Sequence, residues 1–205
     1  MKIVSLEGPD FSGKSTLATS LLMALRKKGL TVERTELPSR LVTGLFTSLL
    51  RNSKDEVDKN VFSLIQAADH LHHYNSFKTN NNADVLILER SSLSYFIYQG
   101  FILGADIDWL KELNKFNKML PDITIIPKVP YDELLRRKNI RVGLKDQFEE
   151  DVFLKKVTKE YYNLPGWLIK KYNVNYIPFN TAENMNKELI KKVLETLNKW
   201  FFFFV

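Results

Sequence analysis

The chain has 205 residues, 44% of them hydrophobic and 26% charged, with no cysteine and a formal net charge of +6. This composition is typical of a globular protein, argues against disorder and excludes disulfide bonds and thiolate metal sites. No stretch approaches the roughly 20 apolar residues of a membrane-spanning helix, and we expect a cytoplasmic protein. The basic residues are scattered, which disfavours nucleic acid as the main ligand and leaves a phosphorylated small molecule as the alternative.

The hydrophobic pattern predicts strands that alternate with helices along the chain. The expected strands are 3–6, 31–37, 85–88, 123–129 and 174–178. The expected helices are 16–28, 41–50, 61–75, 93–103, 109–120, 131–141, 148–171 (one long helix or a pair) and 185–200. This alternation indicates an α/β fold, a five-stranded parallel sheet with helices on both faces, and we expect residues 1–205 to form one domain. In such a fold the functional loops lie along the carboxyl edge of the sheet.

The loop after the first strand reads GPDFSGKS, from Gly8 to Ser15. It fits the pattern Gly, four residues, Gly, Lys, then Ser or Thr, which is typical of the P-loop nucleotide hydrolases and kinases. Glycines leave backbone N–H groups free for phosphate oxygens, Lys14 can reach the terminal phosphates, and the Ser15 hydroxyl can hold Mg²⁺. We therefore expect a polyphosphate such as ATP, bound by Gly8, Asp10, Phe11, Ser12, Gly13, Lys14, Ser15 and Thr16.

A charged pair, Glu89-Arg90, closes the third predicted strand and should emerge at the same edge of the sheet. The carboxylate is suited to hold Mg²⁺ directly or through water, and the guanidinium is suited to take a phosphate bidentately. The alternative is a pair that is only solvated. His70 and His73 share a helix face, but without a third ligand of obvious spacing we favour substrate-facing or solvated histidines over a metal site.

Together these stretches resemble the thymidylate kinases, a family of P-loop nucleoside monophosphate kinases. The resemblance covers nearly the whole chain. It rests on EGPDFSGKST at 7–16, LPSR at 37–40, LIQAADH at 64–70, ERSSLSYFIYQG at 89–100, PDITI at 121–125, and RRKNIR at 136–141 followed by DQFEE. It implies a P-loop kinase fold with a short basic lid at about 136–150. It also implies transfer of the γ-phosphate of Mg-ATP to a deoxynucleoside monophosphate, most often dTMP, and a homodimer formed through the helices at 41–75 and 93–103.

The resemblance also implies roles for individual residues. Asp10 would face the sugar hydroxyl of the acceptor nucleotide, and Arg40 and Arg90 would hold its phosphate. The acceptor pocket would be lined by Gln66, His70, Ser94, Tyr98 and Gln99, and the lid would carry Arg136, Arg137 and Arg141. The catalytic group would then be Lys14, Glu89, Arg90, Arg137 and Arg141, with Ser15 and Glu89 as the metal ligands.

The chain departs from the family pattern at several positions. Gln66 stands where the family usually has an aromatic ring that stacks on thymine, and His70 where it has an arginine near the base. Ser91 replaces a larger ring, Glu89 an aspartate and Gln147 a lid arginine. Some members place a catalytic arginine at the position of Phe11, so we expect Arg137 or Arg141 to supply that charge. These departures predict an altered base preference rather than a loss of activity.

Two other functions fit parts of the pattern. A deoxynucleoside kinase has a turn that resembles Glu89-Arg90-Ser91, but it needs a carboxylate base near the second strand, where Glu36 is the only plausible group. Arg40, just beyond Glu36, favours an acceptor phosphate instead. A non-catalytic ATP-binding protein would keep the loop without turnover, and the combination of Lys14 with the charged pair argues against it.

Overall fold

The structure of the protein is a computed structural model that describes residues 1–52, 57–80, 82–140, 150–179 and 182–201. Five parallel strands form one sheet in the order β2-β3-β1-β4-β5. They are β1 (Lys2–Leu6), β2 (Val32–Glu36), β3 (Val85–Glu89), β4 (Ile123–Lys128) and β5 (Val174–Pro178). The predicted α/β fold with a five-stranded parallel sheet is confirmed, and each strand lies within one or two residues of its expected position.

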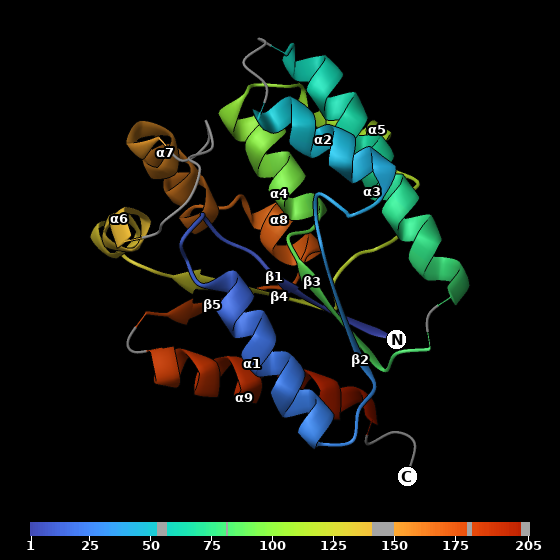
Figure 1. Ribbon diagram of the computed structural model, residues 1–205, viewed down its shortest axis with the longest axis vertical. Coiled ribbons are helices and arrows are strands. Elements are labelled where there is room, and N and C mark those ends of the chain that lie inside the picture. The colour runs from blue at the N-terminus through green and yellow to red at the C-terminus, as the bar shows by residue number, and fades with distance from the viewer. Residues whose placement is uncertain (53–56, 81, 141–149, 180–181, 202–205) are drawn as a thin grey trace.

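Helices cover both faces of the sheet (Figure 1). Helices α1 (Lys14–Lys27) and α9 (Ala182–Phe201) pack together on one face. The other helices are α2 (Val42–Asn52), α3 (Lys59–Asn80), α4 (Ser92–Tyr95), the π-helix η1 (Phe96–Ile102), α5 (Ile107–Leu113), α6 (Tyr131–Ile140), α7 (Asp151–Tyr162) and α8 (Gly166–Lys171). Helices α3, α4 and α8 lie over the opposite face, and α2 packs on α3 (Figure 1).

Because both faces are covered, the central strands are apolar along most of their length. Leu21 and Leu25 of α1 are fully buried against β1 and β3, in a cluster that also takes in Leu189 of α9. On the other face Phe96 and Tyr161 belong to a second cluster built around α4, η1, α7 and α8. Each fully buried leucine or aromatic side chain contributes about 1.5–3 kcal/mol to folding, so the two clusters hold the sheet edge rigid beneath the loops.

The helix predicted at 109–120 is wrong in its second half, since α5 ends at Leu113. The Asn114 side-chain amide donates to the Leu110 carbonyl, and the Asn117 side-chain oxygen Oδ1 accepts from the Met119 backbone N–H. Asparagine side chains that bind nearby backbone groups compete with the helix and end it here.

Two other segments differ in detail from the expected helices. The helix expected at 93–103 is a short α-helix followed by the π-helix η1, and the segment expected at 148–171 is a pair, α7 and α8, separated at Pro165. Residues 141–149, which hold most of the predicted lid, lie outside the described residues. Among the described helices none is long and apolar enough to cross a membrane.

Candidate active site

The carboxyl edge of the sheet brings the predicted phosphate loop next to the Glu89-Arg90 turn. Strands β1 and β3 are parallel neighbours, and their register places Leu6 opposite Glu89. The chain leaves β1 into the loop at residues 7–13 and leaves β3 into Arg90. Two turns that are far apart in the sequence therefore lie side by side.

The loop between β1 and α1 contains three left-handed backbone positions, Gly8, Phe11 and Gly13. A Cβ on Gly8 would lie 3.0 Å from Ser12 Oγ, so this turn needs glycine for space as well as for its φ of 136°. Phe11 adopts a φ of 66°, while its side chain packs against the core cluster of α1. A loop curled in this way ahead of a helix N-terminus is suited to bind an anion.

The Lys14 side chain folds back over this loop. Its Nζ donates to the carbonyl oxygens of Gly8 at 3.1 Å and Pro9 at 2.8 Å, and lies 3.8 Å from an Asp10 carboxylate oxygen. Burial, followed by the nearby Arg90 guanidinium, lowers the pKa of Lys14 from 10.5 to about 7. A polyphosphate would bring the negative charge that keeps this amine protonated.

Ser15 and Glu89 form an oxygen pair at the start of α1. Ser15 Oγ donates to Glu89 Oε2 at 2.6 Å, and Glu89 is 7% exposed. The other carboxylate oxygen, Oε1, accepts from Arg34 Nε of β2 at 2.6 Å. A hydroxyl and a carboxylate are hard oxygen ligands of the kind that Mg²⁺ prefers, so the pair fits that ion.

Arg90 lies at the centre of a group of charges above the loop. Its guanidinium donates to Asp10 Oδ1 and, at 3.2 Å, to the Tyr161 hydroxyl. Arg51, from the end of α2, lies 3.6 Å from the other Asp10 oxygen. Burial alone would raise the pKa of Asp10, but Arg90, Lys14 and Arg51 outweigh it and lower that pKa to about 2. Arg90, Arg51 and, when it is protonated, Lys14 therefore face one ionised carboxylate, an excess of positive charge that suits a phosphate.

A buried glutamate that sequence reasoning missed supports the Arg90 turn from below. Glu7 is fully buried and accepts hydrogen bonds from the Ser91 backbone N–H (2.6 Å) and hydroxyl (2.7 Å), from Ser94 Oγ (2.6 Å) and from the Tyr161 hydroxyl (2.9 Å). These bonds join β1, α4 and α7 around Arg90, which itself adopts a φ of 66°. The only signal in the sequence was its position just before Gly8.

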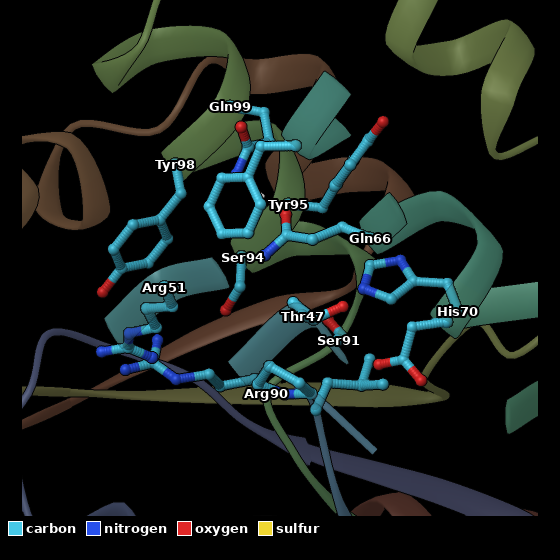
Figure 2. A pocket seen from close by; sticks show the side chains of 14 residues that line it. Thr47, Arg51, Gln66, His70, Arg90, Ser91, Ser94, Tyr95, Tyr98 and Gln99 are labelled. Atoms are coloured by element: carbon cyan, nitrogen blue, oxygen red, sulfur yellow. Dashed lines mark hydrogen bonds between the residues drawn. The ribbon is translucent and has the colours of Figure 1, made fainter. Parts of the chain in front are cut away.

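Two cavities meet at Arg90. The first, which we call the P-loop cavity, is lined by residues 10–17, Glu36, Leu37, Glu89, Arg90, Arg137, Met185 and Asn186. The second, which we call the α3–α4 cavity, is lined by Leu37, Pro38, Thr47, Arg51, Phe62, Gln66, Asp69, His70, Arg90, Ser91, Ser94, Tyr95, Tyr98 and Gln99. Figure 2 shows its polar side chains converging from α2, α3 and the α4–η1 segment, with the Arg51 and Arg90 guanidinium groups close together at one end. Leu37 and Arg90 line both cavities.

The structure thus brings together most of the predicted site residues. Gln66, His70, Ser94, Tyr98 and Gln99 line the α3–α4 cavity together with Arg90. Arg137 lines the P-loop cavity, where its guanidinium donates to the Phe11 carbonyl oxygen at 3.1 Å.

Two predicted arginines, Arg40 and Arg136, do not join this group. The Arg40 side chain is 89% exposed, pairs with Glu36 at 2.8 Å and lines a separate hollow, and Arg51 takes the place beside Arg90 that was expected for it. Arg136 is largely exposed and pairs with Glu133. Arg141 lies outside the described residues. Arg51 was not predicted as a site residue because it lies at the end of an amphipathic helix, where a single arginine is usually solvated.

The histidines make no metal cluster. His70 is buried and interacts with Asn114, His73 with Thr35, and His72 with Thr43. In the described part of the chain no group of three or more His, Asp or Glu side chains could hold a metal ion.

The site has a phosphate loop between a strand and a helix, an arginine turn beside that loop, and a second polar cavity beyond the arginine. This combination defines a P-loop nucleoside monophosphate kinase. Comparison with known proteins narrows this class. The thymidylate kinase family model matches residues 6–190, and the chain belongs to that family. The family's reaction is the ATP-dependent phosphorylation of dTMP to dTDP.

Curated relatives agree over nearly their full lengths. A probable thymidylate kinase of Methanococcus aeolicus is 31% identical, with 95% of this chain and 96% of that protein covered. A probable thymidylate kinase of Sulfurisphaera tokodaii is also 31% identical, with 96% and 95% covered, and one of Methanocaldococcus jannaschii is 29% identical, with 93% of each covered.

Proposed function

We propose that this protein phosphorylates dTMP by holding it in the α3–α4 cavity with its phosphate at Arg90 and Arg51, end to end with ATP in the P-loop cavity. The observation that carries the proposal is that the two cavities share Arg90. A guanidinium at this junction can contact the acceptor phosphate while it lies beside the γ-phosphate.

The charges around Arg90 suit this reaction. The acceptor phosphate is already an oxyanion near neutral pH, so no general base is needed. The barrier comes from bringing two anions together and from charge on the transferring phosphoryl group. Lys14 and the loop amides would hold the ATP phosphates, while Arg90 and Arg51 would hold the acceptor. Asp10 keeps both arginines close. The family resemblance also implies that Asp10 contacts the sugar hydroxyl of the acceptor nucleotide.

Mg²⁺ fits beside Ser15 and Glu89, whose oxygen atoms would hold it. A bound Mg²⁺ would neutralise charge on the ATP phosphates. Arg34 forms an ion pair with Glu89 and holds that carboxylate in place beside Ser15.

Arg137 is our candidate for the cation that the loop itself lacks at Phe11. Its guanidinium reaches the loop from α6, with Nε on Glu133 at 2.7 Å and Nη1 on the Phe11 carbonyl at 3.1 Å. A modest swing from that carbonyl would carry it toward a γ-phosphate in the P-loop cavity. We propose that residues 136–150 act as a lid within a single domain spanning residues 1–205.

We also propose that the protein is a homodimer through α2 and α3. Val42, Leu45, Phe46 and Leu49 follow helical spacing on α2 and are all at least half exposed, and Val61 and Leu64 of α3 are exposed as well. An apolar stripe on two adjacent helices is the kind of surface that a second copy covers. Light scattering at micromolar concentration should give twice the chain mass, and Leu49→Lys should give the monomer.

The experiment that tests the function is ADP release with ATP, Mg²⁺ and one acceptor at a time. We expect turnover with dTMP, none with thymidine, and loss of turnover in Lys14→Met. Turnover with thymidine and none with dTMP would assign a deoxynucleoside kinase instead. ATP binding without ADP release for any acceptor would assign a non-catalytic protein.

A further inference from the structure

The end of the α3–α4 cavity farthest from the two arginines contains a histidine with a defined orientation. His70 is 6% exposed, and its ring packs edge-on against Tyr95 with the ring centroids 5.4 Å apart. In Figure 2 one ring nitrogen points away from the cavity and the other points into it. What this inner nitrogen offers to a ligand depends on which nitrogen carries the proton.

Asn114 decides the position of that proton. His70 Nδ1 lies 3.2 Å from Asn114 Oδ1, while the Asn114 amide nitrogen donates to the Leu110 carbonyl at 3.1 Å. The amide of Asn114 is therefore oriented by the end of α5, and it presents an acceptor to His70. Nδ1 must be the donor, so in the neutral ring the cavity-facing Nε2 carries a lone pair.

The surroundings keep the ring neutral. Burial lowers the pKa of His70, while Asn114 and Asp69 raise it less. Asp69 is itself engaged by the Ser39 backbone N–H and hydroxyl and by Thr43. Arg51 and Arg90 line the same cavity, so the other charges that face it are cationic. Among the described residues none donates a hydrogen bond to Nε2.

The neighbouring amides differ from His70 because their polarity can be reversed. Gln99 Nε2 donates to Gln66 Oε1 at 2.9 Å, and Ser63 Oγ lies 3.4 Å from Gln99 Oε1 while it donates to the Lys59 carbonyl at 2.6 Å. If the side-chain amides of Gln66 and Gln99 both rotated by about 180°, so that their oxygen and nitrogen atoms changed places, Gln66 would donate to Gln99. The Ser63 hydroxyl would then accept a hydrogen bond from Gln99. Gln66 can therefore face a base as donor or acceptor, whereas His70 can only accept.

We propose that His70, oriented by Asn114, recognises the acceptor nucleotide by accepting a hydrogen bond from the N3–H group of its pyrimidine base. This rests on the proposed function, which places dTMP in the α3–α4 cavity. Thymine and uracil carry a single N–H donor, at N3 between two carbonyl groups, so a lone acceptor can pair only there. Cytosine has a lone pair at N3, which would face the lone pair of Nε2. The site therefore selects bases with an N3–H, and Asn114 is a positioning residue.

Nuclear magnetic resonance of the full chain tests this directly. The protein is labelled with ¹⁵N-histidine and the signal of His70 is identified with His70→Gln. We expect Nδ1 protonated and Nε2 unprotonated at pH 7.5. On addition of dTMP labelled with ¹⁵N at N3, we expect a coupling across the hydrogen bond between thymine N3 and His70 Nε2. A protonated Nε2, or bound dTMP without that coupling, would overturn the inference.

Kinetics supply a second readout. We expect Asn114→Leu to raise the KM for dTMP about tenfold, because it releases the ring to the other tautomer, and to leave kcat and the KM for ATP within twofold. His72→Gln, at an exposed position of the same helix, is the matched control and should change nothing. The wild-type protein should favour dTMP over dCMP by at least tenfold in kcat/KM.

Failure of this inference can be told from failure of the proposed function. If dTMP is phosphorylated but Nε2 carries a proton, or if Asn114→Leu leaves the KM for dTMP unchanged, the proposed function stands and His70 does not read N3–H. If dTMP neither binds nor reacts, both are overturned.

Discussion

The two cavities that meet at Arg90 are built in different ways. The P-loop cavity is formed largely by eight consecutive residues, and its shape comes from left-handed backbone turns at Gly8, Phe11 and Gly13. The α3–α4 cavity is formed by single side chains from separate elements, and several of them are held by distant partners, such as Asn114 for His70 and Asp10 for Arg51. Phosphate binding is thus a local property of the chain and base recognition is not. We expect substitutions in the first cavity to remove turnover and those in the second to change the acceptor.

The largest expected effect is at Lys14, which belongs to the P-loop cavity. Lys14→Met should lower kcat about 10³-fold, because it removes a cation that stabilises the transferring phosphoryl group. The affinity for dTMP, measured by calorimetry, should change less than threefold, since that nucleotide lies beyond Arg90. A tenfold loss of dTMP affinity would show that the two cavities are not separable in this way.

The next largest effect concerns Glu7, which ties the two cavities together. Glu7→Gln keeps the shape but places an amide among four hydrogen-bond donors, so we expect the free energy of unfolding to fall by about 2–3 kcal/mol. Urea unfolding measures it. Glu36→Gln, at the partly exposed end of β2, is the control and should cost less than about 0.5 kcal/mol. Equal midpoints for the two variants would mean that the Arg90 turn does not depend on Glu7.

A matched pair of arginines tests the α3–α4 cavity. Arg51→Ala should raise the KM for dTMP about 10- to 100-fold, because it removes a charged partner of the acceptor phosphate, and should leave the KM for ATP within threefold. Arg40→Ala should leave both constants within twofold, since Arg40 is 89% exposed and pairs with Glu36. A larger rise in the KM for dTMP in Arg40→Ala than in Arg51→Ala would show that Arg40 binds the acceptor phosphate, as the sequence alone predicted.

The smallest effect is a pH dependence of the unliganded protein. The pKa of Lys14 is about 7 in the folded protein and 10.5 as a free side chain, so between these values the unfolded chain binds more protons than the folded one. Stability should therefore rise with pH, by about 1 kcal/mol per unit between pH 7 and 9. Lys14→Met should remove this rise, and a wild-type protein that loses stability over the same range would contradict the assignment.

The P-loop cavity could be predicted from the sequence more completely than the α3–α4 cavity, because only the first is built from consecutive residues. The P-loop and the alternation of strands and helices were predictable because each depends on short-range spacing. Arg51, Glu7 and Asn114 were not, because their roles appear only when α2, β1 and α5 are brought to the same sheet edge. The end of α5 was missed in the same way, since the Asn114 and Asn117 side chains there bind backbone groups instead of continuing the helix.

One measurement tests the central claim most directly, the binding of a molecule in which adenosine and thymidine are joined 5′ to 5′ through a chain of five phosphates. If ATP and dTMP lie end to end across Arg90, calorimetry should show this molecule binding at least 100-fold more tightly than either nucleotide alone, and Arg90→Ala should remove most of that gain. Binding no tighter than that of ATP would mean that the two cavities are not occupied in line, and the account would be wrong.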